Sequence, residues 1–345
     1  MSREAWESEG GPVSAPTLTV PPEVQEIVRL VDQKISAVEE SLLNCLRSDV
    51  SVIDEAGRYI YDGGGKRVRP LLLLLSAKLS GYQGSRDVLY AVVFELIHTA
   101  TLAHDDVIDE ASVRRGRKSL NSRWGNGLTV LLGDYLYIKS MSVALLGEDL
   151  KFLNLLADIT LSMIEGEIIQ SRRNGCADLT EEEHLDIVRR KTAFLFSGCA
   201  RTGALLTDAP PERVRALEQY GLNLGMEFQL VDDLLDFTSK ESILGKPIGN
   251  DLKEGRLTLP LIYLLEGGNP RGKELIEKIL ATGEFDAAHR EEILDLVRET
   301  GALERARETA IRYAGRARSA LDDFEDSPTR DALKALPDFI LARNH

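Results

Sequence analysis

Apolar residues recur along most of this chain at spacings of three and four, which is the period of an α-helix. Near the start, the recurring positions are Leu30, Val31, Ile35 and Val38. The stretch from Val88 to Ala103 is almost wholly apolar and too long for a strand, so it predicts a buried helix. No run shows the alternation of a strand, and no series of hairpins is evident. From Pro22 onward the pattern therefore predicts an all-α helical bundle around one central cavity.

Signals for helix ends divide the rest of the chain. Asp208, followed by Pro210, Pro211 and Glu212, predicts a helix start with Asp208 as its cap. Gly301 suits a helix stop. Further helices are predicted over residues 151–173, 291–298, 302–324 and 329–343, the last of them bent at Pro337.

Composition narrows the class of protein. The chain has 345 residues, of which 43% are hydrophobic, so it can bury a large core. Its net charge of −14 argues against nucleic-acid binding. Three cysteines without disulfide or metal spacing, and an acidic start without an apolar signal region, predict a cytoplasmic protein. Residues 1–20 predict a disordered tail, and 21–345 a single domain.

One acidic pattern, DDxxD, occurs twice in apolar surroundings. Its aspartates are Asp105, Asp106 and Asp109 in the first copy, and Asp232, Asp233 and Asp236 in the second. On a helix the first and last aspartates share a face, and the middle one lies about 100° to one side. Such carboxylates repel one another, so a cation is the simplest explanation. The alternative is a solvated acidic helix end, which is less convincing for two copies than for one.

The acids predict a magnesium site for a diphosphate. Carboxylate oxygens suit Mg²⁺, which keeps some of its waters and favours substrate phosphates as further ligands. Two such clusters that face each other would hold several divalent ions.

A glycine-rich basic segment, GGGKRVRP at 63–70, is the second strong signal. The glycines let backbone N–H groups approach an anion, and the apolar run that follows suggests a helix start. Lys66, Arg67 and Arg69 add positive charge, although a plain basic loop is the alternative reading. Weaker signals are Arg114, Arg115, Lys191, Thr192, Lys246 and His98, the last of which, taken alone, is more typical of a core residue.

Together these motifs closely resemble the trans-polyprenyl diphosphate synthase family, and most of all its long-chain, octaprenyl-type bacterial members. The matching segments are GGGKRVRP at 63–70, LAHDDVIDEASVRRG at 102–116, KTA at 191–193, FQLVDDLLD at 228–236 and GKPIGNDLKEGRLTLP at 245–260. The resemblance implies an isoprenoid-synthase fold, a homodimer, and about three Mg²⁺ ions per active site.

The resemblance also implies a role for each matching residue. Lys66, Arg69, His98 and Arg115 would bind isopentenyl diphosphate. The allylic diphosphate would be bound by Arg114, Lys191, Thr192, Gln229, Lys246 and Arg256. All six aspartates would be metal ligands; the residues expected to be catalytic are Asp105, Asp106, Asp109, Lys191, Asp232 and Asp233. Arg256 stands where the family often has lysine; the positive charge is retained, so we expect the phosphate contact to be retained as well.

The implied reaction is sequential head-to-tail condensation. Mg²⁺ and cationic side chains would make the allylic diphosphate a leaving group, and isopentenyl diphosphate would attack the cation that remains. Loss of a proton to the departing diphosphate would complete each cycle. A dry, apolar cavity would protect the cation from water.

Product length depends on the helix before Asp105. Ala100 and Thr101 are small, so no bulky side chain closes the cavity at that level, and Ile97 lies about one turn, or 5.4 Å, deeper. We therefore expect a product longer than about C20, in the range of about C35–C45 with octaprenyl as the single best value, for a quinone side chain. Membrane contact would be peripheral at most.

Three other functions fit some of these features. A terpene cyclase shares DDxxD but does not need an isopentenyl site. A non-catalytic subunit of a heteromeric prenyl synthase would generally have lost acidic motifs, and this chain keeps both. A short-chain farnesyl or geranylgeranyl diphosphate synthase remains an alternative.

Overall fold

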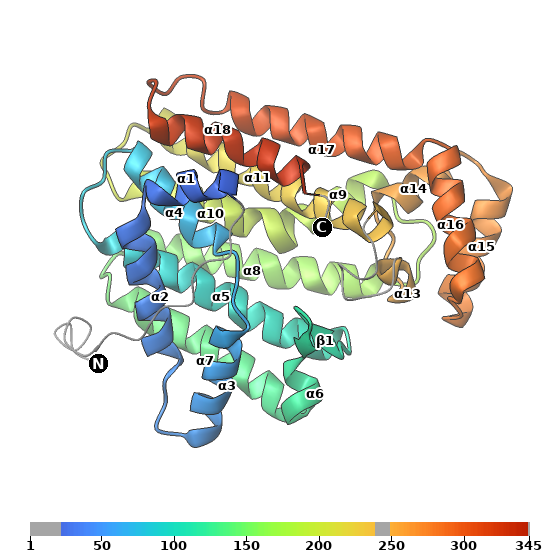
Figure 1. Cartoon of the computed structure of the whole chain (residues 1–345), viewed down its shortest axis with the longest axis horizontal. Helices are drawn as coiled ribbons and strands as arrows, with labels where there is room; N and C mark the ends of the chain where they lie inside the picture. The colour runs from blue at the N-terminus through green and yellow to red at the C-terminus, as the bar shows by residue number, and fades with distance from the viewer. Residues whose placement is uncertain (1–21, 239–248, 344–345) are drawn as a thin grey trace. The chain divides into compact units, whose positions relative to one another are not determined.

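A computed structural model describes residues 22–238 and 249–343 of the chain (Figure 1). The described helices are α1 (Pro22–Arg29), α2 (Asp32–Leu46), α3 (Ser51–Asp62), α4 (Val68–Leu79), α5 (Arg86–Ile108), α6 (Leu120–Trp124), α7 (Asn126–Leu145), α8 (Leu150–Arg173), α9 (Glu181–Val188), the π-helix η1 (Arg189–Ala193), α10 (Phe194–Leu205), α11 (Pro211–Thr238), α13 (Asn250–Lys253), α14 (Leu259–Glu266), α15 (Pro270–Thr282), α16 (Ala287–Glu299), α17 (Ala302–Ser319) and α18 (Pro328–Leu341). Two short strands, β1 (Val113–Arg114) and β2 (Arg117–Lys118), pair in an antiparallel sheet. The predicted all-α class is confirmed.

The chain divides into two compact units. Unit 1 comprises Met1–Leu156 and Cys199–Val214, and unit 2 comprises Ala157–Gly198 and Arg215–His345. The single domain expected over 21–345 stays a prediction, and the disordered tail expected over 1–20 lies outside the described residues.

Helix α5 forms the centre of unit 1. Every residue from Leu89 to Ile97 is buried, which confirms the predicted helix there, and the helix extends over Arg86–Ile108. Helices α7, α4 and α2 pack against α5. Two glycines bring α5 close to its neighbours: a Cβ on Gly133 would lie 2.3 Å from His104 Nε2, and one on Gly147 would lie 2.6 Å from the Tyr90 hydroxyl. A larger residue at either position would therefore displace the His104 or Tyr90 side chain.

Helix α7 has an apolar outer side. Leu131, Ile138 and Leu145 are 63%, 64% and 59% exposed, and their seven-residue spacing places them along one side of the helix. Among the described residues, α7 is the one helix that is long and apolar enough to cross a membrane by those two criteria. Its other side packs on α5, as in the core helix of a folded unit.

Helix α11 forms the centre of unit 2. Gly225 lets it approach η1, because a Cβ there would lie 2.6 Å from the Ala193 Cα. At its other side, the buried Tyr220 hydroxyl donates a 2.6 Å hydrogen bond to the Leu333 carbonyl of α18.

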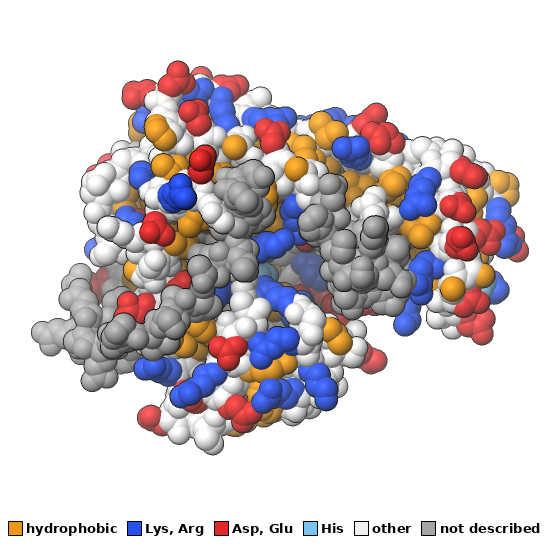
Figure 2. All heavy atoms as spheres, in the orientation of Figure 1, with side chains coloured by type: hydrophobic (Ala, Val, Ile, Leu, Met, Phe, Trp, Pro, Cys, Tyr) orange, Lys and Arg blue, Asp and Glu red, His pale blue; other side chains and the backbone are white. Residues whose placement is uncertain are grey.

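In the face that Figure 2 shows, acidic and basic side chains are both spread over the surface, so the net negative charge does not form one continuous patch there.

Several predicted helix ends differ by a few residues. The first hydrogen bond of α11 runs from Val214 N–H to the Pro210 carbonyl, so Pro210 holds the cap position that was predicted for Asp208. Helix α17 ends at Ser319, short of the predicted Phe324, because tight bonds between residues three apart replace the helical pattern from there on. Gly301 does precede α17 with a φ of 74°, and Pro337 lies inside α18 without ending it.

Unit 2 also buries an acid that no hydrogen bond holds. Glu227 on α11 is fully buried, and neither of its carboxylate oxygens has a hydrogen-bond partner. Burial raises the pKa of Glu227 to about 9, against a partial opposing effect of Arg318. The side chain is therefore protonated in the folded protein at neutral pH.

We expect Glu227→Gln to stabilise the protein, and increasingly so as pH rises. Between the ordinary glutamate pKa of 4.5 and about 9, the folded state holds a proton that the unfolded state releases, so the stability of the natural protein falls with pH. Glutamine does not titrate, so at pH 8 the variant should be more stable by on the order of 2 kcal/mol. Chemical denaturation across this pH range measures the difference. Glu308→Gln, at an exposed site on α17, is the matched control, and a pH-independent difference for Glu227→Gln would contradict the account.

Candidate active site

A short β-hairpin, which the sequence pattern did not predict, places two of the expected phosphate ligands in unit 1. Val113 pairs with Lys118 and Arg114 with Arg117, which leaves a two-residue loop of Arg115 and Gly116. Both loop residues have positive φ, 51° and 71°, as a type I′ turn requires. The strained Arg115 donates a hydrogen bond to the Gly64 carbonyl, which ties the hairpin tip to the glycine-rich loop.

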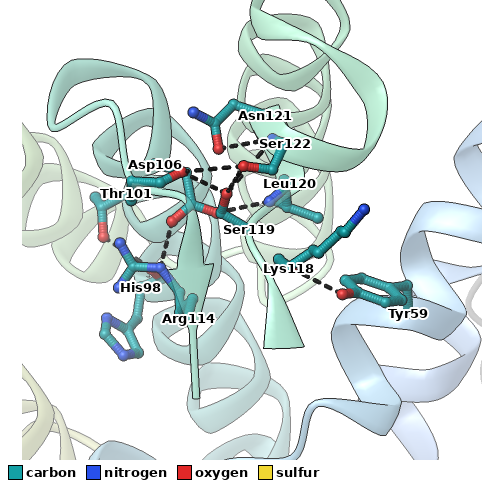
Figure 3. Close-up of polar contacts among 11 residues, drawn as sticks. Tyr59, His98, Thr101, Asp106, Arg114, Lys118, Ser119, Leu120, Asn121 and Ser122 are labelled. Atoms are coloured by element: carbon teal, nitrogen blue, oxygen red, sulfur yellow. Dashed lines mark hydrogen bonds and ion pairs between the residues drawn. The ribbon is translucent and has the colours of Figure 1, made fainter. Parts of the chain in front are cut away.

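The three aspartates of the first motif, at the C-terminal end of α5, have different surroundings. Asp106 is only 1% exposed, whereas Asp105 and Asp109 are half-buried. Arg114 Nε donates to one oxygen of Asp106, and the Leu120 N–H donates to the other at 2.9 Å (Figure 3). The outer pair thus shares the more exposed face, as the helical spacing predicts.

The glycine-rich loop in front of α4 is held by a buried ion-pair network. Arg67 has a left-handed conformation, with φ 47°, and its guanidinium bonds Glu39 at 2.6 and 3.2 Å and Glu95 at 2.9 Å. Because Arg67 points into the protein, its charge supports the loop, while Lys66 and Arg69 remain the ligands that the sequence predicted. Nothing in the residue pattern distinguishes Arg67 from Lys66 and Arg69 as the internal cation.

His98 lies among arginines in unit 1. Its pKa is well below the ordinary histidine value, first because burial disfavours the imidazolium and then because Arg69 and Arg115 are close. The ring is therefore neutral and can donate one hydrogen bond without adding charge. Figure 3 shows His98 beside Arg114. The structure thus brings His98 close to Arg69, Arg114 and Arg115, while the binding roles that the resemblance implies for them stay predictions.

The predicted chain-length residues lie on α5 one to two turns below Asp105. Ala100 and Ile97 are each 1% exposed, and Thr101 is half-buried with its hydroxyl bonded to the His98 carbonyl at 2.8 Å. All three side chains are small or aliphatic, so none of these three positions carries an aromatic ring that would block a growing product beside α5. Their effect on product length stays a prediction.

The second motif lies near the end of α11 in unit 2 and repeats the asymmetry of the first. Asp233 is 5% exposed, and Asp232 and Asp236 are half-buried. Gln229 Nε2 donates to Asp233 at 3.0 Å, and the Thr192 hydroxyl donates to Gln229 Oε1 at 3.0 Å. His184 Nε2 lies 3.2 Å from the other Asp233 oxygen. Thr192 and Gln229, predicted separately, are therefore joined through one chain of hydrogen bonds.

The outer aspartates of the second motif also have partners. Asp236 accepts the N–H groups of Asn250 and Asp251 at 3.1 and 3.2 Å, at the start of α13. Asp232 lies 2.9 Å from Nη1 of Arg343, at the end of the chain. Sequence reasoning missed both Arg343 and His184, because each lies far from the motif along the chain and neither belongs to a recognisable pattern.

Acidic groups around Asp236 disfavour one another's ionisation. The pKa of Asp236 is raised to about 6, first by burial and then by the charges of Asp233 and Glu254. The pKa of Asp251 is raised well above its ordinary value by burial and by Asp236. A cation would relieve this repulsion, and hard carboxylate donors suit Mg²⁺. Within the ranges the structure describes, however, no three acidic, histidine or cysteine side chains converge closely enough to enclose a metal without another ligand.

Two further predicted cations, Lys191 and Arg256, lie in unit 2. Lys191, on the π-helix η1, bonds Gln170 at 2.8 Å and lies 2.5 Å from a Glu167 oxygen. A π-helix is frequent at functional sites, and here it shifts Lys191 relative to a regular helix. Arg256 lies 3.0 Å from Glu254 and 3.8 Å from Asp251. Lys246 is outside the described residues. The first motif belongs to unit 1 and the second to unit 2, so whether they face each other stays a prediction.

Comparison with known proteins identifies the class. The polyprenyl synthetase family matches residues 50–297, and the chain belongs to that family. It is a trans-prenyltransferase that makes long-chain products, although the exact chain length is not fixed by the comparison. The chain is 37% identical over 322 residues to an octaprenyl diphosphate synthase of Escherichia coli, covering 93% of this chain and 99% of the relative.

A second relative and a solved structure agree with this result. Heptaprenyl diphosphate synthase component 2 of Geobacillus stearothermophilus is 36% identical over 313 residues, covering 90% of this chain and 96% of the relative. A crystal structure of a polyprenyl synthase from Caulobacter crescentus, in complex with calcium and isoprenyl diphosphate, is 34% identical with a TM-score of 0.90. The match covers 97% of this chain and all of that one. These findings confirm the isoprenoid-synthase fold.

Proposed function

We propose that this enzyme extends an allylic diphosphate with successive isopentenyl diphosphate units to an all-trans product of about C35–C45, with octaprenyl diphosphate as the best single value. The observation that carries the proposal is the pair of DDxxD motifs whose outer aspartates remain the more exposed ones, together with the arginine and histidine cluster of unit 1. The octaprenyl relative supports the length.

The cation cluster of unit 1 suits isopentenyl diphosphate. Arg69, Arg115 and the neutral His98 would donate hydrogen bonds to the diphosphate oxygens, and Lys66 would add charge from the same loop. The neutral ring is useful there because a further positive charge beside the arginines would be costly. This diphosphate stays attached to its carbon skeleton during the reaction, so the site needs to hold it firmly and does not need to activate it.

The allylic diphosphate would be bound by Arg114 and by the unit 2 residues Lys191, Thr192, Gln229, Lys246 and Arg256. These groups would stabilise negative charge as the bond from C1 to the diphosphate oxygen breaks. The double bond of isopentenyl diphosphate then attacks C1 of the allylic cation. A proton leaves C2 of the added unit for the released diphosphate, and a new allylic double bond forms. No side-chain base is required.

Divalent metal fits the outer aspartates. Mg²⁺, about three ions per site, is the proposed metal, because half-buried carboxylates can share it with diphosphate oxygens. When bound, it supplies charge neutralisation to the leaving group. The calcium in the Caulobacter crescentus structure supports a divalent ion in this family.

We further propose a homodimer formed through the exposed side of α7. An apolar stripe on α7 is exposed to water and consists of Leu131, Ile138 and Leu145. The seven-residue spacing of the stripe suits packing against the α7 helix of a second copy. A heteromeric partner is the alternative, since the Geobacillus stearothermophilus relative is named as a component. The protein would be cytoplasmic, with at most peripheral membrane contact, and its product would supply a quinone side chain.

Incubation with isopentenyl and farnesyl diphosphates and Mg²⁺, followed by chromatography of the products, separates the candidate functions. Products longer than about C20 support the proposal. Products that stop at farnesyl or geranylgeranyl diphosphate would indicate a short-chain synthase. A cyclic hydrocarbon would indicate a terpene cyclase, and no product from the pure chain would indicate a non-catalytic subunit.

Asp105→Ala should lower turnover at least about a hundredfold while the thermal unfolding temperature changes little, because the half-buried carboxylate serves the diphosphate site more than the core. Initial rates at saturating substrates and circular dichroism melts measure both effects. A turnover like that of the natural protein would contradict the assignment.

Ala100→Phe should shorten the product to about C15–C20, because an aromatic ring at this buried position would occupy the space beside α5 that the proposal assigns to the growing chain. Thr99→Phe, one residue away on a different face of α5, introduces the same aromatic ring and is the matched control. Product chromatography provides the readout. An unchanged product length in a folded Ala100→Phe variant would refute the role of this position.

Ile138→Glu should convert the dimer into monomers, because a charge would be buried at the centre of the α7 stripe. Sedimentation equilibrium measures the mass. Ile311→Glu changes a similarly exposed isoleucine on α17 and should leave the dimer intact. A monomeric natural protein, or a dimer that survives Ile138→Glu, would exclude this interface.

A further inference from the structure

A buried triad of charged side chains lies behind the glycine-rich loop of unit 1. Arg67 donates to Glu39 of α2 from Nε at 2.6 Å and from Nη2 at 3.2 Å, and to Glu95 of α5 from Nη1 at 2.9 Å. The arginine side chain is 9% exposed, and each glutamate side chain is 5% exposed. One arginine against two glutamates gives the triad a net charge of −1, and all three guanidinium nitrogens are engaged.

Gly65 lies against two guanidinium groups. A Cβ at this position would be 2.8 Å from Nη1 of Arg67 and 3.3 Å from Nη1 of Arg115. Arg115, at the tip of the hairpin, also donates a hydrogen bond to the Gly64 carbonyl. The triad and the hairpin tip therefore hold the glycine-rich loop at adjacent residues.

The backbone at both of these arginines is strained. Arg67 has a φ of 47° and Arg115 a φ of 51°, and they are two of the four non-glycine residues with positive φ in the described part of the chain. Such a conformation costs free energy and persists only where surrounding contacts hold it. The ion pairs of Arg67 thus maintain a loop shape that the backbone alone would not favour.

Glu95 is the member of the triad that also reaches the rest of the proposed isopentenyl diphosphate site. It lies three residues before His98 on α5, so the two are neighbours on one helix face. Burial lowers the pKa of Arg115, and the nearby charge of Glu95 opposes that effect. The glycine-rich loop, α5 and the hairpin, which together carry the proposed ligands of this substrate, therefore meet around one buried carboxylate.

Charge and position make opposite contributions at Glu95. As a negative charge near the site, it weakens the attraction of the neighbouring cations for a diphosphate. As an anchor for Arg67 and a counter-charge for Arg115, it keeps the groups that bind the diphosphate in place. The sign of the change on neutralising Glu95 therefore tells which contribution is larger.

We propose that Glu95, together with Glu39, is a positioning residue for isopentenyl diphosphate. Both act through Arg67 on the loop that carries Lys66, and Glu95 acts in addition on Arg115. This inference rests on the proposed function and adds to it two acids that do not touch the substrate.

Glu95→Gln keeps the shape of the side chain and removes its charge. We expect KM for isopentenyl diphosphate to rise about tenfold, with kcat and KM for farnesyl diphosphate each within about twofold of the natural values. Glu40→Gln makes the same chemical change at the exposed residue after Glu39 and is the matched control. A KM for isopentenyl diphosphate that is unchanged or lower in Glu95→Gln would overturn the proposal, because charge alone predicts that direction.

Direct binding gives a readout without turnover. Isopentenyl diphosphate alone, which has no allylic partner to react with, is titrated into each protein in a calorimeter. Its Kd should rise about tenfold in Glu95→Gln and stay within about twofold of the natural value in Glu40→Gln. Equal Kd values for the two variants would contradict the positioning role.

A neutral triad separates positioning from stability. The triple variant Glu39→Gln, Arg67→Met, Glu95→Gln leaves no buried charge without a partner, so its thermal unfolding temperature should stay close to that of the natural protein. It should still show the raised KM for isopentenyl diphosphate, because nothing then holds the loop at Arg67. A stable triple variant with the natural KM would refute the role of the triad.

Gly65→Ala tests the same contacts without removing a charge. The added methyl group would displace the Arg67 or Arg115 guanidinium and should raise KM for isopentenyl diphosphate about fivefold. Gly127→Ala, on α7 where a Cβ meets nothing within 4 Å, is the control. This variant decides the question if the triad variants do not fold, and an unchanged KM in Gly65→Ala would then overturn the proposal.

Failure of the proposed function gives a different result. A natural protein that neither binds isopentenyl diphosphate nor elongates farnesyl diphosphate would contradict the function itself. A natural protein that does both, with Glu95→Gln showing the same KM and Kd, would contradict only the positioning role.

Discussion

Repulsion between neighbouring carboxylates is the constraint on which this structure depends. Each DDxxD motif ends a long helix, α5 or α11, where the helix dipole is negative and like charges are already disfavoured. Around Asp236 the effect is visible as a pKa raised to about 6 by burial and by neighbouring acids. The protein relieves part of the repulsion with its own groups, such as Arg114 at Asp106 and the α13 N–H groups at Asp236. A diphosphate with its metal would relieve the rest.

Helix geometry divides the work within each motif. The spacing of four residues turns the outer aspartates to one side, and the middle aspartate turns toward the protein. Arg67 illustrates a similar difference among the cations: it is internal and pairs with Glu39 and Glu95, whereas Lys66 and Arg69 are the residues proposed to bind diphosphate. Residues of like charge that are neighbours in the sequence thus differ in burial, and their burial separates those that pair inside the protein from those that are exposed enough to meet a ligand.

The fold followed largely from the sequence because helical periodicity is a local signal. The apolar run from Val88 to Ala103 predicted α5, and the DDxxD motif that follows this run predicted that its aspartates lie at the C-terminal end of the helix. The hairpin at 113–118 was missed because its strands have two residues each, and its turn depends on Arg115 holding a positive φ through a bond to Gly64. His184 and Arg343 were missed because their partners, Asp233 and Asp232, are distant in sequence and become neighbours only in the folded unit.

Metal at the outer aspartates is the central claim, and anomalous diffraction tests it most directly. Crystals of the protein grown with Mn²⁺ and an unreactive allylic diphosphate analogue would be measured at the manganese edge. We predict peaks about 2.1 Å from oxygens of Asp105 and Asp109 in the first motif and of Asp232 and Asp236 in the second, shared with the diphosphate. Peaks absent from both motifs, with the analogue bound, would contradict the account.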